Sequence, residues 1–240
     1  MNGLKIATIA ALFVFAGTGC AKTEKPMTEN NQTPAVETTK PVETPVVPDA
    51  PIGKLAKVEA PATQMPKSDE VAILDIAGYG RIVLGFFPNK APEHVKNFLN
   101  FAKQGYYDGS TFHRIIPGFM IQGGDPNSKD DDPNNDGMGG PPTRVKAEFN
   151  DLKHLPGTLS MARTQDPNSA GSQFFICHGA VPHLDGQYSI FGQVLSGMDV
   201  VDKIAKSPRG SNDNTFATNC PDRKKIAMKV TVAKWSDVVP

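Results

Sequence analysis

Three blocks of the sequence gather an arginine, glutamines and large apolar side chains at short spacing. They read FHRIIPGFMIQGGD from Phe112, LSMARTQDPNSAGSQFFIC from Leu159 and HLDGQYSIFGQV from His183. The Arg114 guanidinium offers a permanently charged, planar hydrogen-bond donor. Taken singly, a strand arginine is usually a surface ion pair, and Phe or Met usually packs in a core. Only the linked blocks, in this order, make these residues candidates for one site.

The three blocks and the segments between them strongly resemble the cyclophilin family of peptidyl-prolyl cis–trans isomerases, over roughly Glu70 to Asp237. The resemblance implies an enzyme that rotates X–Pro bonds in polypeptides and needs no nucleophile, metal or cofactor. The residues that it implies as catalytic are Arg114, Phe119 and Gln122. Those that it implies as substrate-binding are Met120, Ala162, Arg163, Gln173, Phe175, Leu184 and Tyr188.

In this resemblance Arg114 matches the arginine that acts on the proline nitrogen, and Gln122 matches the glutamine that hydrogen-bonds the substrate backbone. Ala162 and Arg163 match the stretch whose main chain pairs with the substrate, and Gln173 lies at the groove edge. The apolar wall that receives the proline ring is matched by Phe119, Met120, Phe175 and Leu184.

The chemistry explains why such residue types are suitable. The peptide C–N bond resists rotation with a barrier of ~18–20 kcal/mol, because nitrogen shares its lone pair with the carbonyl group. At the top of the barrier the lone pair is localised on nitrogen, where a guanidinium can donate a hydrogen bond to it. That bond exists mainly in the twisted state, so it lowers the barrier instead of only binding substrate.

Two positions depart from the family pattern. His183 stands where the family often has Trp, and Tyr188 replaces a common pocket histidine. Tyrosine still offers a ring face and a hydroxyl, so we expect isomerase activity to be retained. Because the tryptophan position helps to bind cyclosporin in the family, we expect weak cyclosporin sensitivity, which nanomolar inhibition would refute.

The N-terminal residues 1–19 are typical of an export signal of the lipoprotein type. Lys5 precedes an apolar run, Ile6 to Ala16, which is too short for a membrane span. Small residues then lead to Cys20, which we expect to be lipidated, although the position three residues before it is Gly17 and not Leu-like. The alternative is plain secretion after cleavage nearby.

Residues 20–67 are rich in Pro, Thr, Glu, Lys and Val without a helical or strand period, so we expect a disordered tether. The isomerase domain is then predicted over residues 68–240, and we expect it to be monomeric. The predicted location is the cell envelope, as an exported, membrane-anchored lipoprotein. Ala21 after the cysteine weakly favours outer-membrane sorting in a cell with two membranes.

The domain is predicted to be mainly β: a closed antiparallel eight-stranded β-barrel capped by two α-helices. Alternation and turn residues predict strands at 70–76 and 80–87, a Pro117-Gly118 interruption within 111–122, and further strands at 157–162, 173–177, 189–194 and 225–235. Helical spacing predicts helices that begin at Pro92 and Met198.

Two weaker signals lie outside the three blocks. Asp132, Asn134 and Asp136 follow the opening of an EF-hand-like calcium loop, but Thr143 replaces its terminal Glu, which favours an acidic solvated insertion. Cys177 and Cys220 could pair in an oxidising compartment. The alternative, a buried thiol at Cys177, is favoured by its strand position.

Composition narrows the remaining choices. The 240-residue chain has 25 Lys+Arg and 25 Asp+Glu, so no basic excess indicates a nucleic-acid partner. The expected partners are X–Pro polypeptides and, through the anchor, a membrane. One rival interpretation is a non-catalytic proline-peptide-binding or chaperone module. Another is an envelope structural lipoprotein, which would explain only the N-terminal third.

Overall fold

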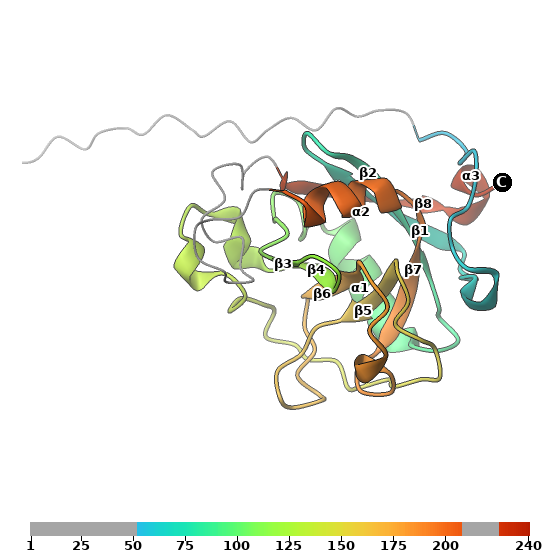
Figure 1. Cartoon of the computed structure of the whole chain (residues 1–240). Coiled ribbons are helices and arrows are strands. Elements are labelled where there is room, and N and C mark those ends of the chain that lie inside the picture. The colour runs from blue at the N-terminus through green and yellow to red at the C-terminus, as the bar shows by residue number, and fades with distance from the viewer. Residues whose placement is uncertain (1–51, 208–225) are drawn as a thin grey trace, which may run out of the picture. The chain divides into compact units, whose positions relative to one another are not determined.

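The computed structural model describes residues 52–207 and 226–240, which form one strongly curled antiparallel sheet with helices packed on it (Figure 1). The eight strands run in the order β3-β4-β6-β5-β7-β2-β1-β8. Their bounds are β1 Glu70–Ile76, β2 Gly80–Phe86, β3 Arg114–Ile116, β4 Met120–Gly123, β5 Thr158–Met161, β6 Phe174–Cys177, β7 Ile190–Ser196 and β8 Met228–Lys234. The helices are α1 Pro92–Lys103, α2 Met198–Ala205 and the short α3 Trp235–Val238, with 3-10 turns η1 Ala62–Gln64, η2 Pro126–Lys129, η3 Pro133–Asn135 and η4 Pro182–Leu184.

The local signals in the sequence predicted most of these elements. Helix α1 begins at Pro92, whose missing N–H is harmless in the first turn, and Gly105 follows its end with φ of 66°. Its buried face includes Val95, Phe98 and Ala102. The 111–122 segment is interrupted at the predicted place, and β3 and β4 form a hairpin across Pro117-Gly118. Trp235, expected at the end of the last strand, begins α3 instead.

The expectation of a closed barrel was wrong. Strands β3 and β8 end the strand order, and among the described residues they meet only near an isolated bridge between Thr111 and Ala227. The reason lies on the open edge of β8, where the Val230 N–H donates to the Asp108 carboxylate at 2.9 Å. This N–H is therefore not available to another strand, and the sheet remains a curled half-barrel.

The inner face of the sheet holds the main core. Aromatic rings meet there from the sheet, from α1 and from the segment after it. Phe98 of α1 lies 5.0 Å from Tyr107, 5.3 Å from Phe174 and 5.6 Å from Phe191, measured between ring centroids. Helix α1 packs on β7 and β8, and α2 packs on β2, β3 and β4. This core fixes the strands whose outer faces carry the features described below.

The packed chain begins earlier than the predicted boundary at residue 68. In the segment 55–64, here called the N-terminal strap, the Leu55 N–H donates to the Val238 carbonyl and the Glu59 N–H to the Leu195 carbonyl, both at 2.7 Å. Figure 1 shows this part of the chain beside α3. Its sequence has few large apolar residues, yet Ala60 and Gln64 are buried. The described part of the predicted tether is therefore docked on the domain.

The strap covers an apolar patch on the outer face of the sheet, here called the covered cluster. Its core consists of Ala60, Val71, Ile73, Val83, Leu195, Val238 and Val239. Gly85 lets the chain pass close to β2, because a Cβ at this position would lie 2.9 Å from Cβ of Pro66. None of the described helices is both long enough and apolar enough to span a bilayer.

Candidate active site

A pocket of about 300 Å³ opens on the outer face of β3, β4 and β6. It brings together residues from all three sequence blocks. They are Arg114, Phe119, Met120, Gln122, Ala162, Arg163, Phe175, Leu184 and Tyr188, together with Gly137. Gln173, the remaining predicted residue, lies in an adjoining hollow of about 180 Å³ that also includes Gln122. Gly137 was not predicted as a pocket residue, because it lies in the acidic insertion.

The β3–β4 hairpin sets the polar edge of the pocket. Arg114 and Gln122 are opposite each other in the ladder, so their side chains share one face. Arg114 Nη1 donates to Gln122 Oε1 at 3.3 Å, and Gln122 Nε2 donates to Gln173 Oε1 at 2.9 Å. Gln173 Nε2 in turn donates to the carbonyls of Gly137 and Gly139. This series of hydrogen bonds fixes the side-chain amide of Gln122 beside the Arg114 guanidinium.

Arg114 is half-buried, and burial lowers the pKa of its guanidinium below its usual value, with Tyr188 opposing the shift. An arginine nevertheless stays charged at neutral pH. The Arg114 side chain is therefore a partly desolvated cation at the mouth of an apolar pocket. Hydrogen bonds from such a cation are stronger than those made in bulk water.

The apolar wall is a second patch on the outer face of the sheet, here called the open cluster. Its buried core is Met120, Phe175, Cys177 and Val181, and its partly buried members are Ile116, Phe119, Ala162, Leu184 and Tyr188. Phe175 and Tyr188 pack edge to face with ring centroids 5.8 Å apart, and the Arg163 guanidinium lies 4.5 Å from the centroid of the Tyr188 ring. The Tyr188 ring thus occupies one side of the pocket.

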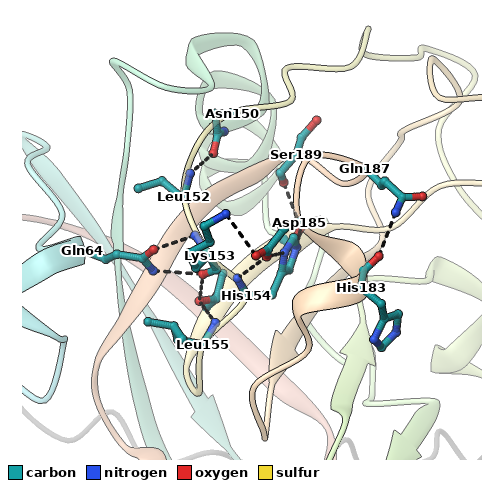
Figure 2. Close-up of polar contacts among 12 residues, drawn as sticks. Gln64, Asn150, Leu152, Lys153, His154, Leu155, His183, Asp185, Gln187 and Ser189 are labelled. Atoms are coloured by element: carbon teal, nitrogen blue, oxygen red, sulfur yellow. Dashed lines mark hydrogen bonds and ion pairs between the residues drawn. The ribbon is translucent and has the colours of Figure 1, made fainter.

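A buried polar network supports the pocket from behind (Figure 2). The His154 ring stacks on Phe175 at 6.1 Å, and its Nδ1 pairs with Asp185 Oδ1 at 3.0 Å. Its Nε2 lies 3.1 Å from Ser160 Oγ. Burial lowers the pKa of His154, while the bond to Asp185 opposes the shift. Asp185 follows Leu184, so this network holds the loop that carries one side of the pocket.

The strap reaches the same network. Gln64 Nε2 donates to the Lys153 carbonyl at 3.0 Å, and the Lys153 N–H donates to Gln64 Oε1 at 2.6 Å, next to His154 (Figure 2). Sequence reasoning missed both Gln64 and His154. No local pattern marks a glutamine in a Pro-rich segment, and His154 acquires its role only when Asp185 and Phe175 fold against it.

The two departures from the family pattern both lie at the pocket. Tyr188 lines it, and the exposed His183 stacks on Phe119 with ring centroids 5.8 Å apart and planes 19° apart. A flat ring therefore still covers Phe119 at the position where the family often has tryptophan.

The carboxylates of the acidic insertion and the thiol of Cys177 do not line the pocket. Asp132 Oδ1 accepts from the Asn134 N–H and caps η3. Within residues 52–207 and 226–240, no three His, Cys, Asp or Glu side chains gather as a metal site would require. The thiol of Cys177 is free and buried, and burial raises its pKa to about 12, with a further contribution from Asp185. Cys20 and Cys220 lie outside the described residues.

Comparison with known proteins finds similar peptidyl-prolyl isomerases. A peptidyl-prolyl cis-trans isomerase of Synechococcus elongatus is 53% identical over 133 residues, which are 55% of this chain and 85% of that protein. A peptidyl-prolyl cis-trans isomerase of Arabidopsis thaliana is 44% identical over 144 residues, or 58% of this chain and 84% of that protein. The crystal structure of a Cryptosporidium parvum cyclophilin-type isomerase, determined in the presence of the dipeptide Ala-Pro, matches with a TM-score of 0.58 and 30% identity over 68% of this chain and 98% of that one.

A family model described as cyclophilin type peptidyl-prolyl cis-trans isomerase/CLD matches residues 71–227. This match covers the whole curled sheet up to the start of β8 and contains every residue that lines the pocket. The chain therefore belongs to the cyclophilin-type peptidyl-prolyl cis-trans isomerases.

Proposed function

We propose that this isomerase rotates X–Pro bonds in the pocket of the open cluster, with Arg114 as the group that stabilises the twisted state. The observation that carries the proposal is the pairing of Arg114 with Gln122 at 3.3 Å beside an apolar pocket of about 300 Å³. The apolar side chains hold the proline ring while the preceding carbonyl turns. The Arg114 guanidinium donates to the proline nitrogen when its lone pair is localised.

The other pocket residues orient the substrate. Gln122, held by Gln173, presents its amide to the substrate backbone, and the main chain of Ala162 and Arg163 pairs with an extended peptide. The Ala162 N–H already donates to the Gln173 carbonyl at 2.9 Å, so its carbonyl is the group that remains for substrate. Phe119, Met120, Phe175, Leu184 and Tyr188 form the surface on which the proline ring lies.

The decisive experiment measures kcat/KM for an X–Pro peptide with residues 20–240 carrying Cys20→Ser, and with Arg114→Ala in the same chain. We expect Arg114→Ala to lower kcat/KM by about 10²- to 10³-fold, because one transition-state hydrogen bond is lost. Arg81→Ala is the matched control. Arg81 pairs with Asp75 on the β1–β2 hairpin, away from the pocket, so this variant should keep full activity.

Two results would change the assignment. Full activity in Arg114→Ala would remove Arg114 from the mechanism. A folded wild-type chain that binds the peptide without accelerating exchange would favour the proline-peptide-binding module instead.

We further propose that the enzyme works outside the cytoplasm as a monomer on a lipid anchor at Cys20, in aid of protein folding. The support is the short apolar run of residues 6–16, the small residues before Cys20 and the Pro-rich stretch after it. Labelling cells with radioactive palmitate should mark the wild-type protein and not Cys20→Ser, with Cys220→Ser as the control. Equal labelling of all three proteins would contradict lipidation at Cys20.

A further inference from the structure

The turn between β3 and β4 places two residues of the pocket wall. Phe119 N–H donates to the Ile116 carbonyl at 3.0 Å across Pro117 and Gly118, and Gly118 has φ of 76°. Proline at the second position and a positive φ at the third are the features of a type II turn. In such a turn the peptide between the two central residues can flip, so the contact made by the Gly118 N–H decides its orientation.

The imidazole of His178 supplies that contact. His178 Nδ1 accepts the Gly118 N–H at 2.8 Å, and His178 Nε2 lies 3.2 Å from Asp202 Oδ1 on α2. An Nδ1 that accepts has no proton, so the ring proton is on Nε2 and is donated to Asp202. The two contacts are consistent only with the neutral ring in this tautomer.

The backbone next to this ring holds the turn from the same side. The His178 N–H donates to the Phe119 carbonyl at 2.9 Å. The following residue, Gly179, lies so close to the turn that a Cβ on it would overlap the Gly118 carbonyl oxygen. The ring and backbone of residues 178–179 thus form a cradle for the turn, and the wall residues Phe119 and Met120 follow directly from it.

We propose that His178 is a positioning residue for isomerisation, which in its neutral form holds the Phe119 turn against the pocket and on protonation releases it. A protonated ring donates from both nitrogens, so Nδ1 can no longer accept from Gly118. The two N–H groups then oppose each other, and the turn loses the bond that orients its central peptide. This inference rests on the proposed role of the pocket as the site of isomerisation.

Among residues 52–207 and 226–240, few charged groups surround the ring. From α2 it faces Asp202, which also pairs with Lys206 at 2.6 Å, and residues 116–119 of the turn carry no titratable side chain. His183 is the other histidine in contact with this turn, through its stacking on Phe119. The test must therefore separate His178 from His183.

The test compares two substitutions of His178 that differ in the atom offered to Gly118. In His178→Asn, the side-chain oxygen lies near the place of Nδ1 and accepts at every pH. In His178→Gln, the longer amide extends toward Asp202 and leaves the Gly118 N–H without its acceptor. KM and kcat for an Ala-Pro-containing tetrapeptide are measured between about pH 5 and pH 8, the range in which a histidine changes charge.

We expect the wild-type KM to rise by about 2- to 10-fold toward acid pH, as loss of one hydrogen bond would give. The KM of His178→Asn should stay low and flat, and that of His178→Gln should be raised at both ends of the range. The value of kcat should change less than KM, because the turn forms the binding wall and not the Arg114 donor. His183→Gln should keep the acid-induced rise.

The NMR resonance of the Gly118 backbone amide gives a second readout that does not depend on activity. We expect it to shift with pH in the wild type, to be pH-independent in His178→Asn, and to lie at its acid-limit position in His178→Gln. A wild-type KM in His178→Gln at both pH values, or loss of the acid-induced rise in His183→Gln, would overturn the proposal. If the resonance behaves as expected while Arg114→Ala keeps full activity, the failure lies with the proposed site and not with the His178 contact.

Discussion

The outer face of the sheet carries two apolar patches, the open cluster and the covered cluster, with opposite fates. Both arise from the same alternation, since every second residue of a strand points away from the main core. On β4 and β6 the outward residues form the wall of a pocket. On β1, β2 and β7 they are buried under the N-terminal strap and the C-terminal residues of the chain.

The comparison of the two clusters shows that an outward-facing apolar patch can serve either stability or binding. Apolar surface removed from water contributes roughly 25 cal/mol per Å². The chain gains that contribution at the covered cluster during folding. At the open cluster the pocket remains uncovered, so part of this free energy is gained only when a proline ring binds. Substitutions in the two clusters should therefore separate stability from activity.

The largest effect should follow from Ile73→Ala in the covered cluster, where Ile73 is fully buried. Loss of a buried isoleucine side chain should lower the free energy of unfolding by about 2–5 kcal/mol. The kcat/KM of the folded fraction should not change. Urea denaturation and peptide isomerisation measured on the same sample check both statements, and a loss of activity in the folded fraction would show that the clusters are coupled.

Gln64→Ala should have the next largest effect, because it removes both hydrogen bonds to Lys153. The Lys153 N–H then loses its acceptor, while the Lys153 carbonyl keeps the bonds from Leu155 N–H and Thr158 Oγ1. We expect a loss of about 1–3 kcal/mol in the free energy of unfolding. Thr63→Ala is the control, since the Thr63 side chain is exposed. Equal stability of the two variants in thermal and urea unfolding would show that the strap is not held at Gln64.

Phe119→Ala should give the reverse pattern in the open cluster. Phe119 is only half-buried, so we expect little loss of stability, but kcat/KM should fall by about tenfold, equivalent to 1.4 kcal/mol. The loss removes one face of the proline wall and the surface on which His183 stacks. If this variant is severely destabilised while the activity of its folded fraction is preserved, the open cluster is a structural core and not a binding wall.

The smallest effect concerns pH. Burial lowers the pKa of His94 and of His154 below the usual 6.5, and their bonds to Glu148 and Asp185 oppose the shift. As the pH falls, the unfolded chain therefore takes up protons before the folded one. The contribution of these two histidines to the free energy of unfolding should be fully present above about pH 6.5 and should decrease below it. His154→Gln should have a shallower pH dependence in urea titrations, and an unchanged slope would exclude His154 as a contributor.

Much of the fold could be predicted because its signals are local. The β1–β2 hairpin shows alternation and turn glycines, and Pro92 and Gly105 delimit α1. The predicted site residues come together because long sequence blocks carry them. The open edge of β8 is occupied by residues 108–110, through the Asp108 carboxylate on Val230 and backbone bonds of Gly109 and Ser110 with Met228, and no periodicity reveals these contacts. The docking of the strap was also missed, because Leu55, Val58 and Ala60 are isolated among Pro, Lys and Glu.

The strap has a mechanical consequence for any pull on the chain ahead of residue 52. Tension would reach the bond from Leu55 to Val238 first and the bond from Glu59 to Leu195 next, before it loads the two bonds of Gln64. Each bond that breaks adds slack and absorbs work while β1 is still in the sheet. While the two Gln64 bonds hold, the load would bear on Lys153, next to His154 behind the pocket. Stepwise rupture of these bonds would therefore reduce the force that a pull on the N-terminal region transmits to the pocket.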